Sequence, residues 1–133
     1  MAYLNPSGTA SIPAKTMYVT GIRIDTMNTV VAVATTATVL QWGCAVGSSG
    51  TSFATADSAT AGTRAPRRMI LGLQSFPVGA TVGAVANTID VKFDAPLMVE
   101  AGTYFHIILK IPIGTATSTE LFRGTIMINS YAE

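Results

Sequence analysis

Residues 89–99, IDVKFDAPLMV, alternate apolar and polar side chains, and this period of two constrains the fold more than any other feature. One face would carry Ile89, Val91, Phe93, Ala95, Leu97 and Val99. The opposite face would carry Asp90, Lys92 and Asp94. Such alternation predicts a β-strand with one buried face. Pro96 cannot donate a hydrogen bond to a neighbouring strand, so it marks a sheet edge or a bend.

The same period recurs along most of the chain. Strands are expected within residues 16–26, 29–46, 69–76, 104–113 and 120–133. Their proposed inward faces carry Tyr18, Ile22 and Ile24, then Leu40, Trp42, Cys44 and Val46, then Phe105, Ile107, Leu109, Ile111 and Ile113, and finally Phe122, Ile126 and Ile128. Arg23 and Asp25 are expected opposite Ile22 and Ile24, beside Met17 and Val19. No stretch shows a sustained helical period. The pattern therefore predicts an all-β protein with a single-domain, jelly-roll-like β-sandwich over residues 16–133.

Residues 1–15 read differently from the rest of the chain. Pro6, Gly8 and Pro13, with serine and threonine between them, favour an extended N-terminal arm. Residues 47–65 form a second segment of small and polar residues, which is long for a connection inside a compact domain.

The chain of 133 residues carries few charges for its size, with eight Lys and Arg and seven Asp and Glu. A folded monomer of this mass would expose roughly 6,600 Å². Monomers rarely leave large continuous apolar patches uncovered, so the low charge density predicts a subunit whose surface is partly covered by other protein. The alternative is a threonine-rich surface, because threonine suits an exposed strand face.

Charge and cysteine content narrow the possible partners. A net charge of +1 gives no overall attraction to nucleic acid or anionic lipid. The single cysteine, Cys44, excludes an internal disulfide and is expected to pack as a small hydrophobic residue. The N-terminus lacks the pattern of a secretory signal, and residues 29–40 are too short and too rich in threonine to span a bilayer. We therefore expect a soluble protein, made in a cytoplasm, with no membrane partner.

The sequence offers few residues for catalysis. His106 is the only histidine, and no serine or cysteine in a nucleophile motif accompanies it. Asp90 and Asp94 would lie about 13 Å apart on a strand, farther than glycoside hydrolysis requires. Neither a phosphate-binding loop nor a calcium loop is present. We predict a protein that is not an enzyme, without a metal, a cofactor or a small-molecule substrate.

Three arginines, Arg64, Arg67 and Arg68, lie within the five residues RAPRR. One interpretation is a solvated loop end that keeps the protein soluble. A second is a phosphate contact, which three arginines without neighbouring aromatic residues would make only weakly. A third is a protein interface, where the planar guanidinium pairs with carboxylates and Pro66 limits the entropy lost on docking. We favour the third and predict that these arginines bind a partner protein.

Several longer segments carry a family resemblance. TMYVTGIRIDTMNTVVAVATT, ATADSATAGTRAPRR and LMVEAGTYFHIILKIPIGTATSTELFRGTI, together with the proline-containing arm, resemble small β-sandwich virion proteins of tailed bacteriophages. The likeness is greatest to capsid decoration, or cement, proteins. It implies a homotrimer on the outer surface of the virion capsid that bridges neighbouring subunits of the major capsid protein and stabilises the head.

Two other functions are compatible with the same fold class. One is a receptor-binding or carbohydrate-binding module of a phage fibre or tail, which would use exposed aromatic side chains. Fluorescence quenching of Trp42 by a glycan would favour it. The other is a structural protein of the tail or neck, which the sequence does not separate from a capsid role.

Overall fold

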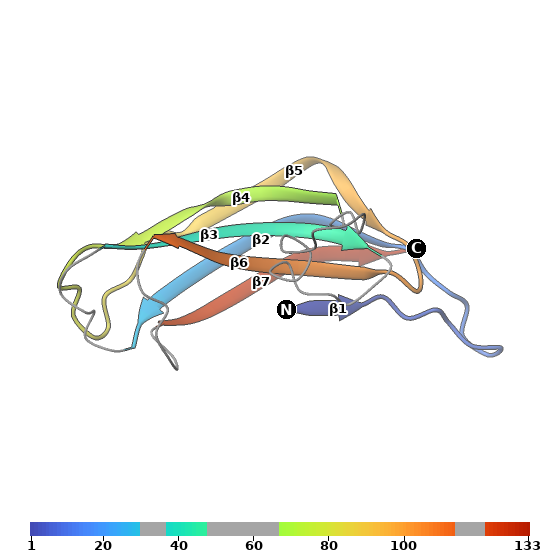
Figure 1. Cartoon of the computed structure of the whole chain (residues 1–133). Coiled ribbons are helices and arrows are strands. Elements are labelled where there is room, and N and C mark those ends of the chain that lie inside the picture. The colour runs from blue at the N-terminus through green and yellow to red at the C-terminus, as the bar shows by residue number, and fades with distance from the viewer. Residues whose placement is uncertain (30–36, 48–66, 114–121) are drawn as a thin grey trace, which may run out of the picture.

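The computed structural model describes residues 1–29, 37–47, 67–113 and 122–133, which form an all-β sandwich (Figure 1). The strands are β1 (Ala2–Leu4), β2 (Met17–Asn28), β3 (Thr38–Gly47), β4 (Arg67–Phe76), β5 (Ile89–Val99), β6 (Tyr104–Ile113) and β7 (Phe122–Ala132). One sheet has the order β1-β6-β3-β4 and the other has the order β5-β2-β7. All strand pairs are antiparallel. The predicted β-sandwich is confirmed.

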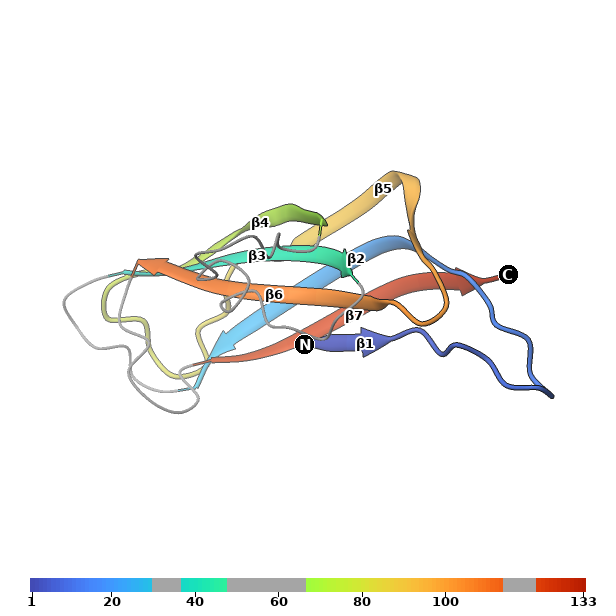
Figure 2. The same cartoon turned by 45° about the vertical axis from the view of Figure 1, so that its right-hand side comes forward.

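The core fills the space between the two sheets, because alternate side chains of each strand point inward. It contains most of the inward residues expected for β3, β5 and β6, including Leu40, Trp42, Val99 and Phe105. Ala95 is an exception, because it is exposed in β5. Cys44 is 1% exposed and packs there as a small apolar side chain, as the sequence predicted. Tilting of one sheet against the other is visible in Figure 2.

The expected face assignment at the start of β2 is wrong. A register shift between Val19 and Gly21 leaves Thr20 as an extra residue in the strand. Val19 therefore points into the core together with Ile22, while Tyr18 points outward. Counting by twos fails across such a bulge, because one additional residue moves every side chain before it to the other face.

β5 bends sharply where the sequence predicted a bend. Val19 pairs with Leu97, but Gly21 pairs with Lys92, so residues 93–96 of β5 stand opposite the single residue Thr20. The strand arches away from β2 over these four residues, and Figure 1 shows the arch beside β4. Pro96 lies in the arch, in keeping with its missing donor.

The beginning of the chain is bonded to its own sheet. β1 pairs with the start of β6, and the amino group of Met1 donates to the carbonyl of Ile107 at 2.9 Å. Asn5 is buried and donates through Nδ2 to the carbonyls of Lys15 and Val99 at 2.8 and 2.9 Å. Residues 6–15 belong to no strand.

A buried glutamine joins the two sheets. Gln74 on β4 is fully buried, and its Oε1 accepts hydrogen bonds from Trp42 Nε1 at 2.8 Å and from Thr26 Oγ1 at 2.9 Å. Its Nε2 donates to the carbonyls of Ile24 at 3.2 Å and Asn87 at 2.6 Å. A buried amide costs free energy unless its polar atoms form hydrogen bonds, and all four hydrogen bonds of Gln74 are made, so the side chain links the sheets without that cost.

Candidate functional site

The predicted arginine cluster does not lie within one loop. Arg67 and Arg68 are the first two residues of β4, and their backbones pair with Val46 and Ala45 of β3. Arg64 lies outside the described residues. The structure therefore places two of the three arginines at the start of a strand, and their role in partner binding stays a prediction.

His106 is buried, with 4% of its surface exposed. The sequence placed it on the less apolar face of its strand, and that face is buried at His106 but exposed at Lys110. It lies in register with Ala2 on β1 and Ala45 on β3. Across the part of the chain that the structure describes, no three His, Cys, Asp or Glu residues gather closely enough to hold a metal ion.

Charged residues on the outer face of the β5-β2-β7 sheet neutralise one another. Arg23 Nε donates to Asp25 Oδ2 at 3.0 Å, and Thr88 Oγ1 donates to Asp25 Oδ1 at 2.6 Å. The Thr88 hydrogen bond, followed by that of Arg23, stabilises the carboxylate and lowers the pKa of Asp25. Asp90 is in register with Arg23 and adds to its negative surroundings.

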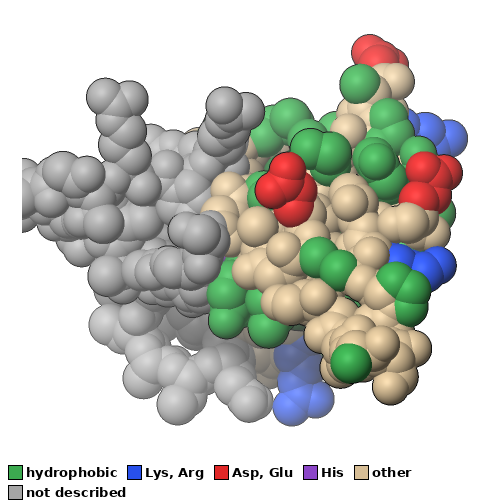
Figure 3. Space-filling model, turned by 90° about the vertical axis from the view of Figure 1, so that its right-hand side faces the viewer, with side chains coloured by type: hydrophobic (Ala, Val, Ile, Leu, Met, Phe, Trp, Pro, Cys, Tyr) green, Lys and Arg blue, Asp and Glu red, His purple; other side chains and the backbone are tan. Residues whose placement is uncertain are grey.

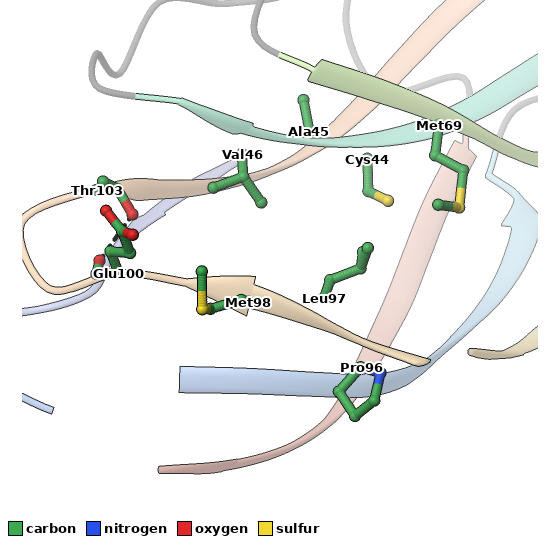
Figure 4. Close-up of a pocket in the computed structure, with 9 residues that line it drawn as sticks. All are labelled: Cys44, Ala45, Val46, Met69, Pro96, Leu97, Met98, Glu100 and Thr103. Atoms are coloured by element: carbon green, nitrogen blue, oxygen red, sulfur yellow. Dashed lines mark hydrogen bonds between the residues drawn. The ribbon is translucent and has the colours of Figure 1, made fainter. Parts of the chain in front are cut away.

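An apolar cavity of about 450 Å³ lies where the two sheets separate (Figure 4). The arch of β5 forms one wall, and β3 with the start of β4 forms the other. The lining residues are Cys44, Ala45, Val46, Met69, Pro96, Leu97, Met98, Glu100 and Thr103. Figure 4 shows Cys44, Met69 and Leu97 pointing into the space between the walls. Its size is that of a typical ligand pocket.

The chemistry of the cavity suits an apolar occupant. Met69 is a flexible thioether that adapts to irregular shapes, and it is 41% exposed. Met98 also lines the cavity, and its exposed side chain lies opposite Tyr18 in the strand register. Burial raises the pKa of Cys44 to about 11, so this thiol stays protonated and unreactive at neutral pH. The carboxylate of Glu100, which is exposed, is the one charged group among the described residues of the lining. The cavity can bind an apolar side chain, but it lacks an activated nucleophile.

Large apolar side chains are exposed on both sheets. Ile70 and Leu73 project from β4, and Met98, Met127 and Tyr131 project from the other sheet. In Figure 3, apolar side chains form several separate groups on the described surface, among other side chains and backbone and a few charged side chains. The exposure agrees with the low charge density of the sequence and marks surfaces suited to protein contacts.

An aromatic pair lies on the outer face of the β5-β2-β7 sheet. Tyr18 and Tyr131 stack with ring centroids 5.0 Å apart and planes 16° apart. They are directly opposite in the β2 and β7 register, and Met98 lies opposite Tyr18 on β5. Sequence reasoning assigned Tyr18 to the core and missed this pair, because the bulge at Thr20 leaves no clear signal.

The described part of the chain contains no helix long and apolar enough to cross a membrane. No family model, curated protein or solved structure matches the chain.

Proposed function

We propose that this protein is a non-enzymatic capsid decoration protein that binds across neighbouring major capsid subunits of a tailed bacteriophage and stabilises the head. The observation that carries the proposal is the exposure of large apolar side chains on both sheets of a chain with only eight cations and seven anions. Such a surface gains free energy when a partner covers it. The choice of the major capsid protein as that partner rests on the resemblance to virion β-sandwich proteins.

A homotrimer explains how modest contacts would hold the protein on the shell. Each trimer would engage several symmetry-related sites, and the first contact raises the effective concentration of the others. Arg64, Arg67 and Arg68 are proposed to pair with carboxylates of the major capsid protein. The bound protein would be located on the virion surface.

Co-sedimentation with purified virions tests this proposal. The protein is expected in the virion pellet, and electron microscopy is expected to show it on the head. A variant with Arg64, Arg67 and Arg68 changed to Ser should lose occupancy. Its control changes Lys92, Lys110 and Arg123, all exposed and outside the cluster, to Ser. Full occupancy of the arginine variant would remove the cluster from the mechanism, and binding to tails alone would refute the capsid role.

A second candidate, a receptor-binding or carbohydrate-binding module of a fibre or tail, is favoured by the Tyr18 and Tyr131 stack. Sugar rings bind to exposed aromatic faces, whereas Trp42 is 6% exposed and bonded to Gln74. Quenching of Trp42 fluorescence would therefore miss sugar binding at the surface. The appropriate test is a glycan array probed with the native protein and with the Tyr131→Ala variant. Binding that depends on Tyr131 would favour this function over capsid decoration.

A further inference from the structure

Residues 6–15 form a projection that we call the N-terminal finger. Figures 1 and 2 show it extending away from the sandwich between β1 and β2. Its base is held by Asn5, whose backbone exchanges hydrogen bonds with Thr103 at 2.9 Å and Gly102 at 2.8 Å. The side chain of Asn5 also bonds the carbonyl of Lys15, which closes the base. The finger is therefore anchored at both ends.

The finger contains a closed turn that presents an apolar side chain to water. Thr9 and Ile12 exchange backbone hydrogen bonds of 2.7 and 3.2 Å, and Thr9 Oγ1 also accepts from the Ile12 amide. Gly8 precedes the turn with a φ of 78°, which glycine adopts without strain. Ile12 is 64% exposed. A preorganised turn loses little conformational entropy on docking, so its exposed isoleucine is suited to insertion.

The cavity at the arch of β5 complements the finger. Both lie toward the same end of the sandwich, because Thr103 lines the cavity and also bonds the base of the finger. Residues 6–14 of the finger carry no charge, and the cavity lining is apolar apart from Thr103 and Glu100. Lys15 at the base of the finger and Glu100 at the cavity make no ion pair within the described chain. They can pair between two copies.

We propose that the finger of one copy docks in the cavity of a second copy, with Ile12 inserted between Met69 and Leu97 and with Lys15 near Glu100. The contact is heterologous, because finger and cavity are different surfaces. A heterologous contact of this kind gives a ring when the rotation between neighbours closes, as the proposed homotrimer requires. This contact gives the proposed self-association a specific interface and does not depend on the virion role.

Disulfide trapping tests the pairing with two introduced cysteines, because the native Cys44 is 1% exposed and its thiol stays protonated. In a Cys44→Ala background, oxidation of the double variant Ile12→Cys and Met69→Cys is expected to link neighbouring copies, giving covalent oligomers on non-reducing gels. Met69 lines the cavity and is 41% exposed. A closed trimer would end the ladder at three. The matched control carries Val82→Cys in place of Ile12→Cys, because Val82 is 58% exposed in the connection between β4 and β5. Neither the control nor Ile12→Cys without Met69→Cys should form the ladder.

Self-association measured by sedimentation velocity gives the second readout. Ile12→Asp should weaken association at least about tenfold, because a carboxylate replaces a buried apolar side chain. Val82→Asp should associate like the native protein. Equal association of the two variants, or crosslinking of Ile12→Cys that does not need Met69→Cys, would overturn the finger contact while leaving the proposed function standing. A native protein that is monomeric would overturn both the finger contact and the proposed homotrimer.

Discussion

Replacement of Gln74 by leucine tests whether the buried amide network joins the two sheets. The change removes all four hydrogen bonds of the amide and leaves the Trp42 indole and the Thr26 hydroxyl without their acceptor. Each buried donor left unsatisfied costs about 1–3 kcal/mol. Burial of the leucine offsets part of this cost. We expect the free energy of unfolding to fall by about 2–4 kcal/mol, a large share of the roughly 5–15 kcal/mol typical of a domain.

Urea denaturation at a fixed protein concentration measures this loss. For a slope of about 2 kcal/mol per molar urea, the midpoint should fall by roughly 1–2 M. The control is Gln41→Leu, the same change at a partly exposed, outward position of β3. Adding Thr26→Val to Gln74→Leu should recover about 1 kcal/mol, because it removes one stranded hydroxyl. A loss for Gln74→Leu no larger than that for Gln41→Leu would refute the network as a source of stability.

Three further predictions concern Asp25, Cys44 and Gly8. The pKa of Asp25 is lower in the folded protein than its ordinary value of 3.8, so the ionised carboxylate stabilises the fold at pH values above 3.8, and this contribution disappears as the pH falls through the lower folded pKa. Thr88→Val should raise the folded pKa in a carboxyl NMR titration, and an unchanged titration would contradict the assignment. With a pKa of about 11, roughly one Cys44 thiol in a thousand is ionised at pH 8. Alkylation of Cys44 should therefore be at least about a hundredfold slower in the native protein than in urea, and equal rates would show an accessible thiol. Gly8→Ala would place a Cβ 2.8 Å from the carbonyl oxygen of Ile12, so it should distort the finger and weaken self-association. The control Gly83→Ala, at φ 86° with open space around the Cβ, should leave self-association unchanged, and equal effects of the two variants would exclude a role for the finger.

The sequence predicted those features that depend on neighbouring residues. Alternation along β5 places Ile89 and Val99 in the core because a strand that faces water on one side needs two different faces. The turn at residues 100–103 was equally readable, and Gly102 has the expected positive φ of 80°. In contrast, Thr20 could not be recognised as a bulge, because Met17, Tyr18 and Val19 are all apolar and either alternate set fits a core.

The candidate site escaped prediction because it depends on contacts between distant residues. Cys44, Met69 and Leu97 meet only because the two sheets separate at the arch of β5. The polar network has the same character, since Gln74 lies 32 residues from Trp42 and 48 from Thr26. A lone glutamine in MILGLQSF gives no sign that it is buried until the facing sheet is known.

The edges of the sandwich explain why an interface would form at the cavity. β5, an edge strand of its sheet, carries charged side chains and a proline, which disfavour the addition of a strand from another chain. These residues are Asp90, Lys92, Asp94 and Pro96. Residues 69–76 of β4 contain neither a charge nor a proline, and β4 is one of the two edge strands of the other sheet, together with β1. Asn87 Nδ2 bonds the carbonyl of Leu73 at 3.1 Å and covers one point of that edge.

Within the described residues, an edge strand without charge or proline lies beside an apolar cavity, and both features favour association with another chain. Met69 belongs to both features, since it starts the uncharged part of β4 and lines the cavity. Arg67 and Arg68 directly precede it, and the backbone of Arg67 pairs with Val46 in the cavity wall. A neighbour docked in the cavity would therefore lie next to the strand that carries two of the three predicted arginines. Loss of capsid binding on Met69→Asp, with self-association intact, would show that the capsid protein rather than a second copy occupies this side.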